Sequence, residues 1–312
     1  MSLDNNLDIA IKKCDGSLYY KNDWCYHIYP FTTENISGYI DFFDLKDKSL
    51  LTVGSSCDQA LNAILKGIKD ITVLDINPFV KYYYFLKMAL ILEVDMNDYL
   101  LFLRYKDYPK SFVDNKNVFN IDIFNKIKST LRVLDFESYL FWDNLFQKFS
   151  PNTIREKLFF SDENKDLVIK NSNIYLNNSI VYNELKDRIK KIEPLFLTGN
   201  IEEINLDLKY DNIWLSNILT WNYSYEKIID IFNNFYKYLN DNGMMLVSYL
   251  YDTNKDTKYD SNWCDIYNLE KIFSIFKEYD IDIKSFTGVM GILFQDDVFK
   301  KDSVLVCKKK VL

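Results

Sequence analysis

From residue 49 onward, the chain alternates short apolar runs with stretches of helical periodicity. The apolar runs predict five strands, at residues 49–53, 71–75, 195–198, 210–216 and 244–250. Helices are predicted between several of them, at residues 59–66, 79–92 and 224–239. This alternation is typical of βα units, which form a mainly parallel sheet with helices on its faces.

Polar and small residues mark the ends of several of these elements. We place Asp58 as the N-cap of the first of these helices and Gly67 as its C-terminal stop. Pro78 lies where the first turn of the next helix begins, a position that proline favours. The Asn242-Gly243 pair predicts a turn just before the fifth strand.

The alternation stops in the middle of the chain and changes again near its end. Helical periodicity in the middle predicts helices at 119–134, 136–149 and 180–192. Near the end we expect a helix at 265–276 and extended segments at 281–286 and 303–307, which pair as the antiparallel edge of the sheet. The sequence thus predicts a seven-stranded, mostly parallel, Rossmann-like α/β fold in three parts: an N-terminal helical cap segment (1–48), an α/β domain (49–96 and 194–312) and a helical insertion (97–193).

Residues at the first two strand ends indicate a nucleoside site. Ligands of doubly wound sheets bind beyond the carboxyl ends of the strands, where the strand order reverses. Gly54 permits a tight turn there, and Ser55 and Asp58 lie beside a helix N-terminus whose free amides can bind a carboxylate. Asp75 ends the second strand and can accept hydrogen bonds from both hydroxyls of a ribose. We expect these four residues to contact the cofactor.

The loop after the first strand also indicates which nucleoside binds. Dinucleotide enzymes use G-x-G-x-x-G so that the backbone can approach a pyrophosphate closely. The second and third glycine positions are Ser56 and Gln59 in this chain. S-adenosylmethionine has no phosphate and requires only the turn, the amides and the ribose acceptor. We therefore expect S-adenosylmethionine as the cofactor, with a nicotinamide dinucleotide as the alternative.

The third and fourth strand ends complete the predicted cofactor site. Asn200 and Ile201 follow the third strand, where a polar side chain can meet the adenine amino group and an apolar one its face. A simple loop is the alternative for that segment. Ser216 and Asn217 follow the fourth strand, where the sulfonium and the acceptor would lie.

Four residues are candidates for a direct part in catalysis. Trp221 and Tyr223 follow the fourth strand, and an aromatic ring beside a desolvated cation stabilises it by about 1–2 kcal/mol. His27 is the only histidine and has the near-neutral ordinary pKa of a general base, and Tyr29 lies two residues further on. Core packing is the alternative explanation for these residues. The segment 26–33 and the inserted helices are expected to cover the acceptor pocket.

Composition narrows the class of protein. The chain has 312 residues, 48% of them hydrophobic, which suffices for a full core. A net charge of −7 argues against nucleic acid as a partner, because such binding needs a dense basic face. The five cysteines are scattered without C-x-x-C spacing, which predicts neither disulfides nor a metal site. Because no apolar run is long enough to span a membrane, we expect a soluble, cytoplasmic protein.

Several stretches resemble the aminocarboxypropyl transferases of betaine-lipid synthesis and their uncharacterised relatives. The similar stretches are Leu51-Thr52-Val53-Gly54-Ser55-Ser56-Cys57-Asp58-Gln59-Ala60-Leu61, Leu74-Asp75-Ile76-Asn77-Pro78 with Leu86-Lys87, Leu215-Ser216-Asn217-Ile218, and Phe141-Trp142-Asp143 in the insertion. The resemblance implies the class I methyltransferase fold and S-adenosylmethionine as donor. It also implies cofactor contacts at Gly54, Asp75, Asn77 and Ser216. We expect Ile76, between Asp75 and Asn77, to contact the cofactor as well.

The sequence therefore predicts a group transferase that uses S-adenosylmethionine. The transferred group is either 3-amino-3-carboxypropyl or methyl, because both reactions use the same sulfonium and differ in the carbon that faces the nucleophile. We expect a small-molecule acceptor, either a metabolite or a lipid. The alternatives are a non-catalytic S-adenosylmethionine-binding protein and a nicotinamide-dependent oxidoreductase.

Overall fold

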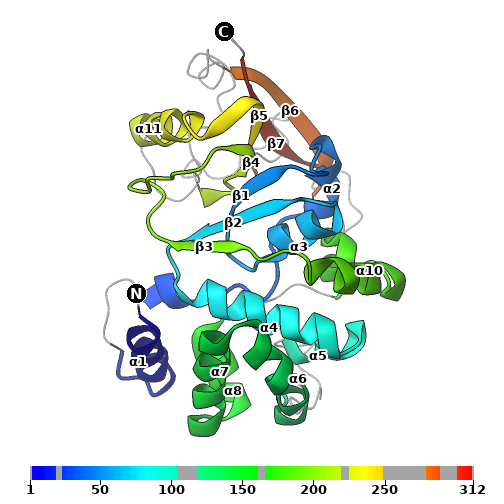
Figure 1. The fold of residues 1–312 in the computed structure, drawn as a ribbon. Helices are drawn as coiled ribbons and strands as arrows, with labels where there is room; N and C mark the ends of the chain where they lie inside the picture. Colours follow the sequence, from blue (N-terminus) through cyan, green and yellow to red (C-terminus); the bar gives the residue numbers. More distant parts are fainter. Residues whose placement is uncertain are drawn as a thin grey trace.

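A seven-stranded sheet forms the centre of the protein, seen in a computed structural model (Figure 1). The structure describes residues 2–18, 23–103, 118–160, 166–218, 225–248, 279–288 and 301–310. The sheet has the order β3-β2-β1-β4-β5-β7-β6. The strands are β1 (Ser49–Val53), β2 (Asp70–Asp75), β3 (Leu195–Thr198), β4 (Tyr210–Trp214), β5 (Leu239–Val247), β6 (Tyr279–Thr287) and β7 (Lys301–Lys309).

The strand order confirms the fold expected from the sequence. Strands β1 to β5 pair in parallel, and β7 runs antiparallel to both β5 and β6. The chain builds outward from β1 to β2 and β3 on one side, then crosses back to β4 on the other. The protein thus has the Rossmann-like class I methyltransferase fold. The switch point of strand order lies between β1 and β4, and ligands of such sheets bind there.

Helices cover both faces of the sheet and form the N-terminal segment and the insertion. The N-terminal helices are α1 (Leu3–Cys14) and α2 (Ile36–Tyr39), and those of the α/β part are α3 (Asp58–Leu65), α4 (Phe79–Glu93) and α11 (Tyr225–Tyr236). The insertion contains α5 (Met96–Leu103), α6 (Ile121–Leu134), α7 (Phe136–Lys148), α8 (Pro151–Leu158), α9 (Asp166–Ser172) and α10 (Ser179–Ile189). Short 3-10 turns occur at Asp23–Tyr26, Ile40–Phe42 and Ile174–Leu176.

Alternating side chains of the central strands divide the core between the two faces. Leu50 of β1 packs in the cluster that contains α3, α4 and the insertion, whereas the adjacent Leu51 packs in the cluster of α11. Successive strand residues point to opposite faces, and a strand buried on both is apolar throughout. The α4 helix lies between the sheet and α6 to α8 (Figure 1) and is buried on nearly every side. The insertion therefore shares one core with the sheet.

Side-chain caps set where most of the inserted helices begin. Asn120, Asp135, Ser150 and Asn178 each accept a hydrogen bond from a backbone N–H in the first turn of α6, α7, α8 and α10, respectively. The sequence predicts three of these helices but not α8. Because α8 has only eight residues, its periodic signal is short.

Two local expectations are wrong. Cys57 rather than Asp58 is the N-cap of α3, and Asp58 is buried as the first helical residue. The Asn242-Gly243 pair does not precede β5 but lies inside it, near a shift of the pairing register with β4. The two C-terminal strands form the antiparallel edge of the sheet as expected, with β7 paired to β5 and β6 outermost. The helix expected at 265–276 lies outside the described residues.

Neither a membrane-spanning helix nor a metal cluster occurs among the described residues. No helix there is long and apolar enough to cross a membrane. The same ranges hold no group of three His, Cys, Asp or Glu side chains placed to bind a metal ion. The four cysteines within them, Cys14, Cys25, Cys57 and Cys307, are free thiols.

Candidate ligand-binding site at the carboxyl edge of the sheet

A cavity of about 360 Å³ lies at the carboxyl ends of β1, β2 and β4. Its size falls within the range of about 300–1,000 Å³ that is common for small-molecule sites. The lining combines strand ends with the N-terminal segment and one residue of the insertion. It consists of Cys25, His27, Tyr29, Thr32, Thr33, Glu34, Val53, Gly54, Ser55, Ser56, Gln59, Leu74, Asp75, Ile76, Asn77, Val80, Phe160, Gly199, Asn200, Ile201, Ser216, Asn217 and Ile218.

Most of the residues expected at the site line this cavity. From the cofactor set, the lining includes Gly54, Ser55, Asp75, Ile76, Asn77, Asn200, Ile201, Ser216 and Asn217, and from the catalytic candidates it includes His27 and Tyr29. Asp58 does not line it, because its carboxylate is fully buried beneath the loop after β1. Trp221 and Tyr223 lie outside the described residues. From the segment 26–33, His27, Tyr29, Thr32 and Thr33 line the cavity.

Asp75 is held in place by backbone amides of two loops. Its Oδ2 accepts a hydrogen bond from the Ser55 N–H at 2.6 Å, and its Oδ1 accepts one from the Asn77 N–H at 2.8 Å. Burial raises the pKa of this carboxyl above its ordinary value, and these amide hydrogen bonds oppose that rise. A carboxylate has about four lone-pair directions, so the side chain retains acceptor capacity toward the cavity.

Gly54 makes room for this arrangement. A Cβ at position 54 would lie 2.5 Å from Val80 Cγ1 and 2.9 Å from Asp75 Oδ2. The following residues Ser55 and Cys57 have positive φ values of 45° and 66°, a backbone conformation that is sparsely populated for non-glycine residues. The loop after β1 therefore contains one glycine, Gly54, and two non-glycine residues with positive φ, Ser55 and Cys57.

We expect Gly54→Ala to lower the free energy of unfolding by about 1–3 kcal/mol, as overpacking of a close-packed site does. Urea denaturation of the variant and of the unmodified protein measures this change. Gly199→Ala is the matched control at the end of β3. The closest atom to its added Cβ is the flexible tip of Ile204, at 3.2 Å, so a smaller loss is expected. Equal losses in the two variants would contradict the proposed close approach at Gly54.

Three contacts hold the N-terminal segment across the strand ends. Asn77 Nδ2 donates to the His27 carbonyl oxygen at 2.8 Å, while Asn77 Oδ1 accepts from the Phe79 N–H at the start of α4. Ile28 forms a parallel bridge with Phe159 of the insertion. The Tyr83 hydroxyl donates to the Pro30 carbonyl oxygen at 2.6 Å. Asn77 thus positions the covering segment as well as lining the cavity.

An aromatic wall closes the cavity on the side of the insertion. The Phe160 ring centroid lies 4.3 Å from that of Tyr29 and 4.9 Å from that of His27. Burial raises the pKa of the Tyr29 hydroxyl, and the nearby charge of Asp75 raises it further. The His27 Nδ1 lies 3.4 Å from the ammonium of Lys13. His27, Tyr29 and Phe160 all line the cavity.

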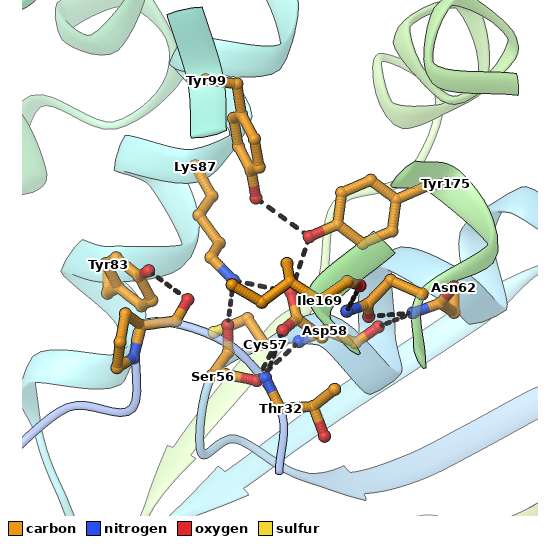
Figure 2. A network of polar contacts seen from close by, with 12 residues as sticks. Thr32, Ser56, Cys57, Asp58, Asn62, Tyr83, Lys87, Tyr99, Ile169 and Tyr175 are labelled. Atoms are coloured by element: carbon orange, nitrogen blue, oxygen red, sulfur yellow. Dashed lines mark hydrogen bonds and ion pairs between the residues drawn. The ribbon is translucent and has the colours of Figure 1, made fainter. Parts of the chain in front are cut away.

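Beneath the loop after β1 lies a buried ion pair, between Lys87 of α4 and Asp58 of α3. The two side chains are fully buried, with Lys87 Nζ 2.6 Å from Asp58 Oδ1. Lys87 also donates to the Ser56 carbonyl oxygen at 2.8 Å. Asp58 accepts further hydrogen bonds from the Tyr175 hydroxyl at 2.7 Å and from the Thr32 N–H at 2.6 Å. Figure 2 shows these groups converging from the loop, two helices, the N-terminal segment and the insertion.

The residue that sequence analysis missed is Glu34. It lies in the covering segment, is 4% exposed and lines the cavity. Its carboxylate accepts hydrogen bonds from the hydroxyls of Ser216, Tyr39 and Ser248 and from the Gln59 amide. Glu34 is a single glutamate followed by Asn35, and this pair belongs to no sequence motif that would mark a site. Its partners come from four separate segments, so only the folded chain identifies it.

The cavity has a negative charge balance. Its lining includes the carboxylates of Glu34 and Asp75, and among the described residues no lysine or arginine lines it. Burial raises the pKa of Glu34, which its four hydrogen-bond donors oppose. Such a site favours a ligand that carries positive charge and disfavours phosphates.

Comparisons with known proteins give no close relative. No protein-family description matches the chain, and no curated protein matches it in sequence. Among solved structures, the N-methyltransferase NodS from Bradyrhizobium japonicum with S-adenosyl-L-homocysteine is 9% identical, with a TM-score of 0.40 over 97% of this chain and 100% of that chain. A TehB-like SAM-dependent methyltransferase from Corynebacterium glutamicum is 10% identical, with a TM-score of 0.38 over 91% and 89% of the two chains. The fold assignment rests on the strand order rather than on these values.

Proposed function

We propose that this protein is a transferase that binds S-adenosylmethionine in the cavity at the carboxyl ends of β1, β2 and β4. The observation that carries the proposal is the close approach of Gly54 and Asp75 at the carboxyl ends of β1 and β2, in a cavity with two carboxylates and no described lysine or arginine. S-adenosylmethionine carries a sulfonium, an ammonium and a carboxylate, for a net positive charge. A cavity of this charge suits that cation better than it suits a dinucleotide.

We propose that particular residues at the strand ends bind particular parts of the nucleoside. Asp75 would accept the ribose hydroxyls with the lone pairs that its backbone contacts leave free. Asn200 and Ile201 at the end of β3 would meet the adenine edge and face. Ser216 and Asn217 at the end of β4 would lie beside the sulfonium and the chain attached to it.

The transfer reaction requires little from the protein besides alignment of the nucleophile with the C–S bond that breaks. A nucleophile on the acceptor attacks a carbon bonded to sulfur, and the electron pair of the broken C–S bond stays on sulfur, which becomes a neutral thioether. The proton of the nucleophile leaves to a base or to water. Holding the reactants in line in a desolvated site supplies most of the acceleration. His27 and Tyr29 line the cavity and are the described candidates to take that proton.

The resemblance to the betaine-lipid enzymes favours transfer of the 3-amino-3-carboxypropyl group, with methyl transfer as the second outcome. Attack on the aminocarboxypropyl carbon releases methylthioadenosine, and attack on the methyl carbon releases S-adenosylhomocysteine. The acceptor is proposed to be a small molecule, either a metabolite or a lipid.

We expect the purified protein to transfer label from S-adenosylmethionine to a component of a cell extract. One sample of S-adenosylmethionine carries ¹³C in the methyl group, and a second sample carries it in the aminocarboxypropyl chain. Mass spectrometry then identifies the labelled acceptor and the nucleoside. Spontaneous breakdown also releases methylthioadenosine, so a heat-inactivated control is required. Binding without either product above that control would instead support a non-catalytic binding protein, and absence of binding would refute the proposal.

A further inference from the structure

Glu34 combines burial, access to the cavity and a carboxylate with no ion-pair partner in the part of the chain that the structure describes. Within the residues that the structure describes, its carboxylate forms no ion pair, although it is 4% exposed. The buried ammonium of Lys87 contacts Asp58 instead. All four hydrogen-bond donors to Glu34 are neutral hydroxyl or amide groups. A buried carboxylate is costly to ionise unless a cation compensates it.

The donors leave one oxygen of Glu34 only partly satisfied. Tyr39, Gln59 and Ser248 all donate to Oε2, at 2.8, 3.2 and 2.8 Å. Among the described residues, Oε1 accepts a hydrogen bond from the hydroxyl of Ser216 alone, and Ser216 also lines the cavity. Because each carboxylate oxygen has about two lone-pair directions, Oε1 can accept one further hydrogen bond.

The sheet places this oxygen well away from Asp75. Glu34 is hydrogen-bonded to Ser216, which follows β4, and to Ser248, which follows β5. Asp75 ends β2, and β1 lies between β2 and β4. Neighbouring strands are about 4.8 Å apart, so β2 and β4 are separated by roughly 10 Å. In S-adenosylmethionine the sulfonium follows directly on the ribose methylene, whereas the α-ammonium lies three carbons further along.

We propose that Glu34 anchors the α-ammonium group of S-adenosylmethionine through Oε1, beside the hydroxyl of Ser216. This inference rests on the proposed function. Asp75 and Glu34 then hold the two ends of the donor, one by its ribose and the other by its amino acid chain. The ammonium supplies the positive charge that the described protein groups around Glu34 lack.

Calorimetric titration with three nucleosides tests the anchor. S-adenosylmethionine has the sulfonium and the ammonium, S-adenosylhomocysteine has only the ammonium, and methylthioadenosine has neither. In Glu34→Gln we expect the affinity for the first two to fall by about tenfold or more, because a charge-assisted hydrogen bond is lost. The affinity for methylthioadenosine should change by less than about threefold. Glu34→Asp retains the charge on a side chain that is one methylene shorter. We expect it to lose less affinity than Glu34→Gln, again for S-adenosylmethionine and S-adenosylhomocysteine and not for methylthioadenosine.

Ser248→Ala is the matched control, because it removes a neutral donor to Glu34 without removing the charge and does not line the cavity. It should affect the three nucleosides alike. A uniform loss in Glu34→Gln would mean a structural role and overturn the anchor, as would unchanged affinities. A loss confined to S-adenosylmethionine would assign Glu34 to the sulfonium instead. If the unmodified protein binds none of the three nucleosides, the proposed function fails and not merely this assignment.

Discussion

Asp75→Ala is expected to weaken binding of S-adenosylmethionine by about 100-fold or more. The variant removes two proposed hydrogen bonds from the ribose hydroxyls to a carboxylate, each contributing about 1.5–3 kcal/mol. It also leaves the Ser55 and Asn77 N–H groups without their acceptor, which loosens the loops on either side. Titration calorimetry on both proteins measures the change. Equal affinities would remove Asp75 from the site.

Two further variants separate binding from folding. Asp75→Asn keeps an acceptor for one of the two backbone amides but loses the charge and the second acceptor, so it should bind more weakly than the unmodified protein and lose less stability than Asp75→Ala. Asp70→Ala changes the exposed carboxylate at the opposite end of the same strand. Surface ion pairs of that kind contribute about 0–1 kcal/mol, and Asp70→Ala should leave nucleoside affinity unchanged.

Lys87→Met is expected to lower the free energy of unfolding by about 3–5 kcal/mol, because it leaves a fully buried Asp58 carboxylate without its cation. The lost ammonium also lies 5.0 Å from the ring centroids of Phe31 and Tyr83, so two cation–π contacts disappear with it. Urea denaturation followed by circular dichroism measures the change. The hydrogen bond to the Ser56 carbonyl is lost as well, so nucleoside affinity should fall in parallel.

The matched control for Lys87 lies on the same helix. Lys81 contacts Glu137 at 2.8 Å and Asp135 at 3.1 Å and is partly exposed, so Lys81→Met should cost no more than about 1 kcal/mol. In the double variant Asp58→Asn with Lys87→Met, the buried charge is gone and part of the lost stability should return. A similar loss for Lys81→Met and Lys87→Met would show that the buried pair has no special role.

The part of the cavity formed by the ends of β1 and β2 could be predicted from local sequence. β1 spans the predicted residues 49–53, and β2 differs from its prediction by one residue. A strand buried on both faces is a continuous apolar run, and a glycine after one strand with an acid after the next marks the switch point. The positions of Gly54 and Asp75 at the ends of β1 and β2 could therefore be predicted without tertiary information. In contrast, Asp58 was assigned to the ligand, because its sequence position beside the loop resembles that of a surface cap.

Tertiary structure alone decided the roles of Glu34, Asp58 and Lys87. Glu34 and Ser216 are 182 residues apart, and Asp58 and Tyr175 are 117 apart, yet their side chains are hydrogen-bonded. Periodicity and turn chemistry encode the conformation of neighbouring residues, so the sequence by itself determined the strands, the first loop and the class of fold. Which buried charges face one another depends on packing between distant segments, and the sequence pattern carries no signal for that contact until the chain has folded.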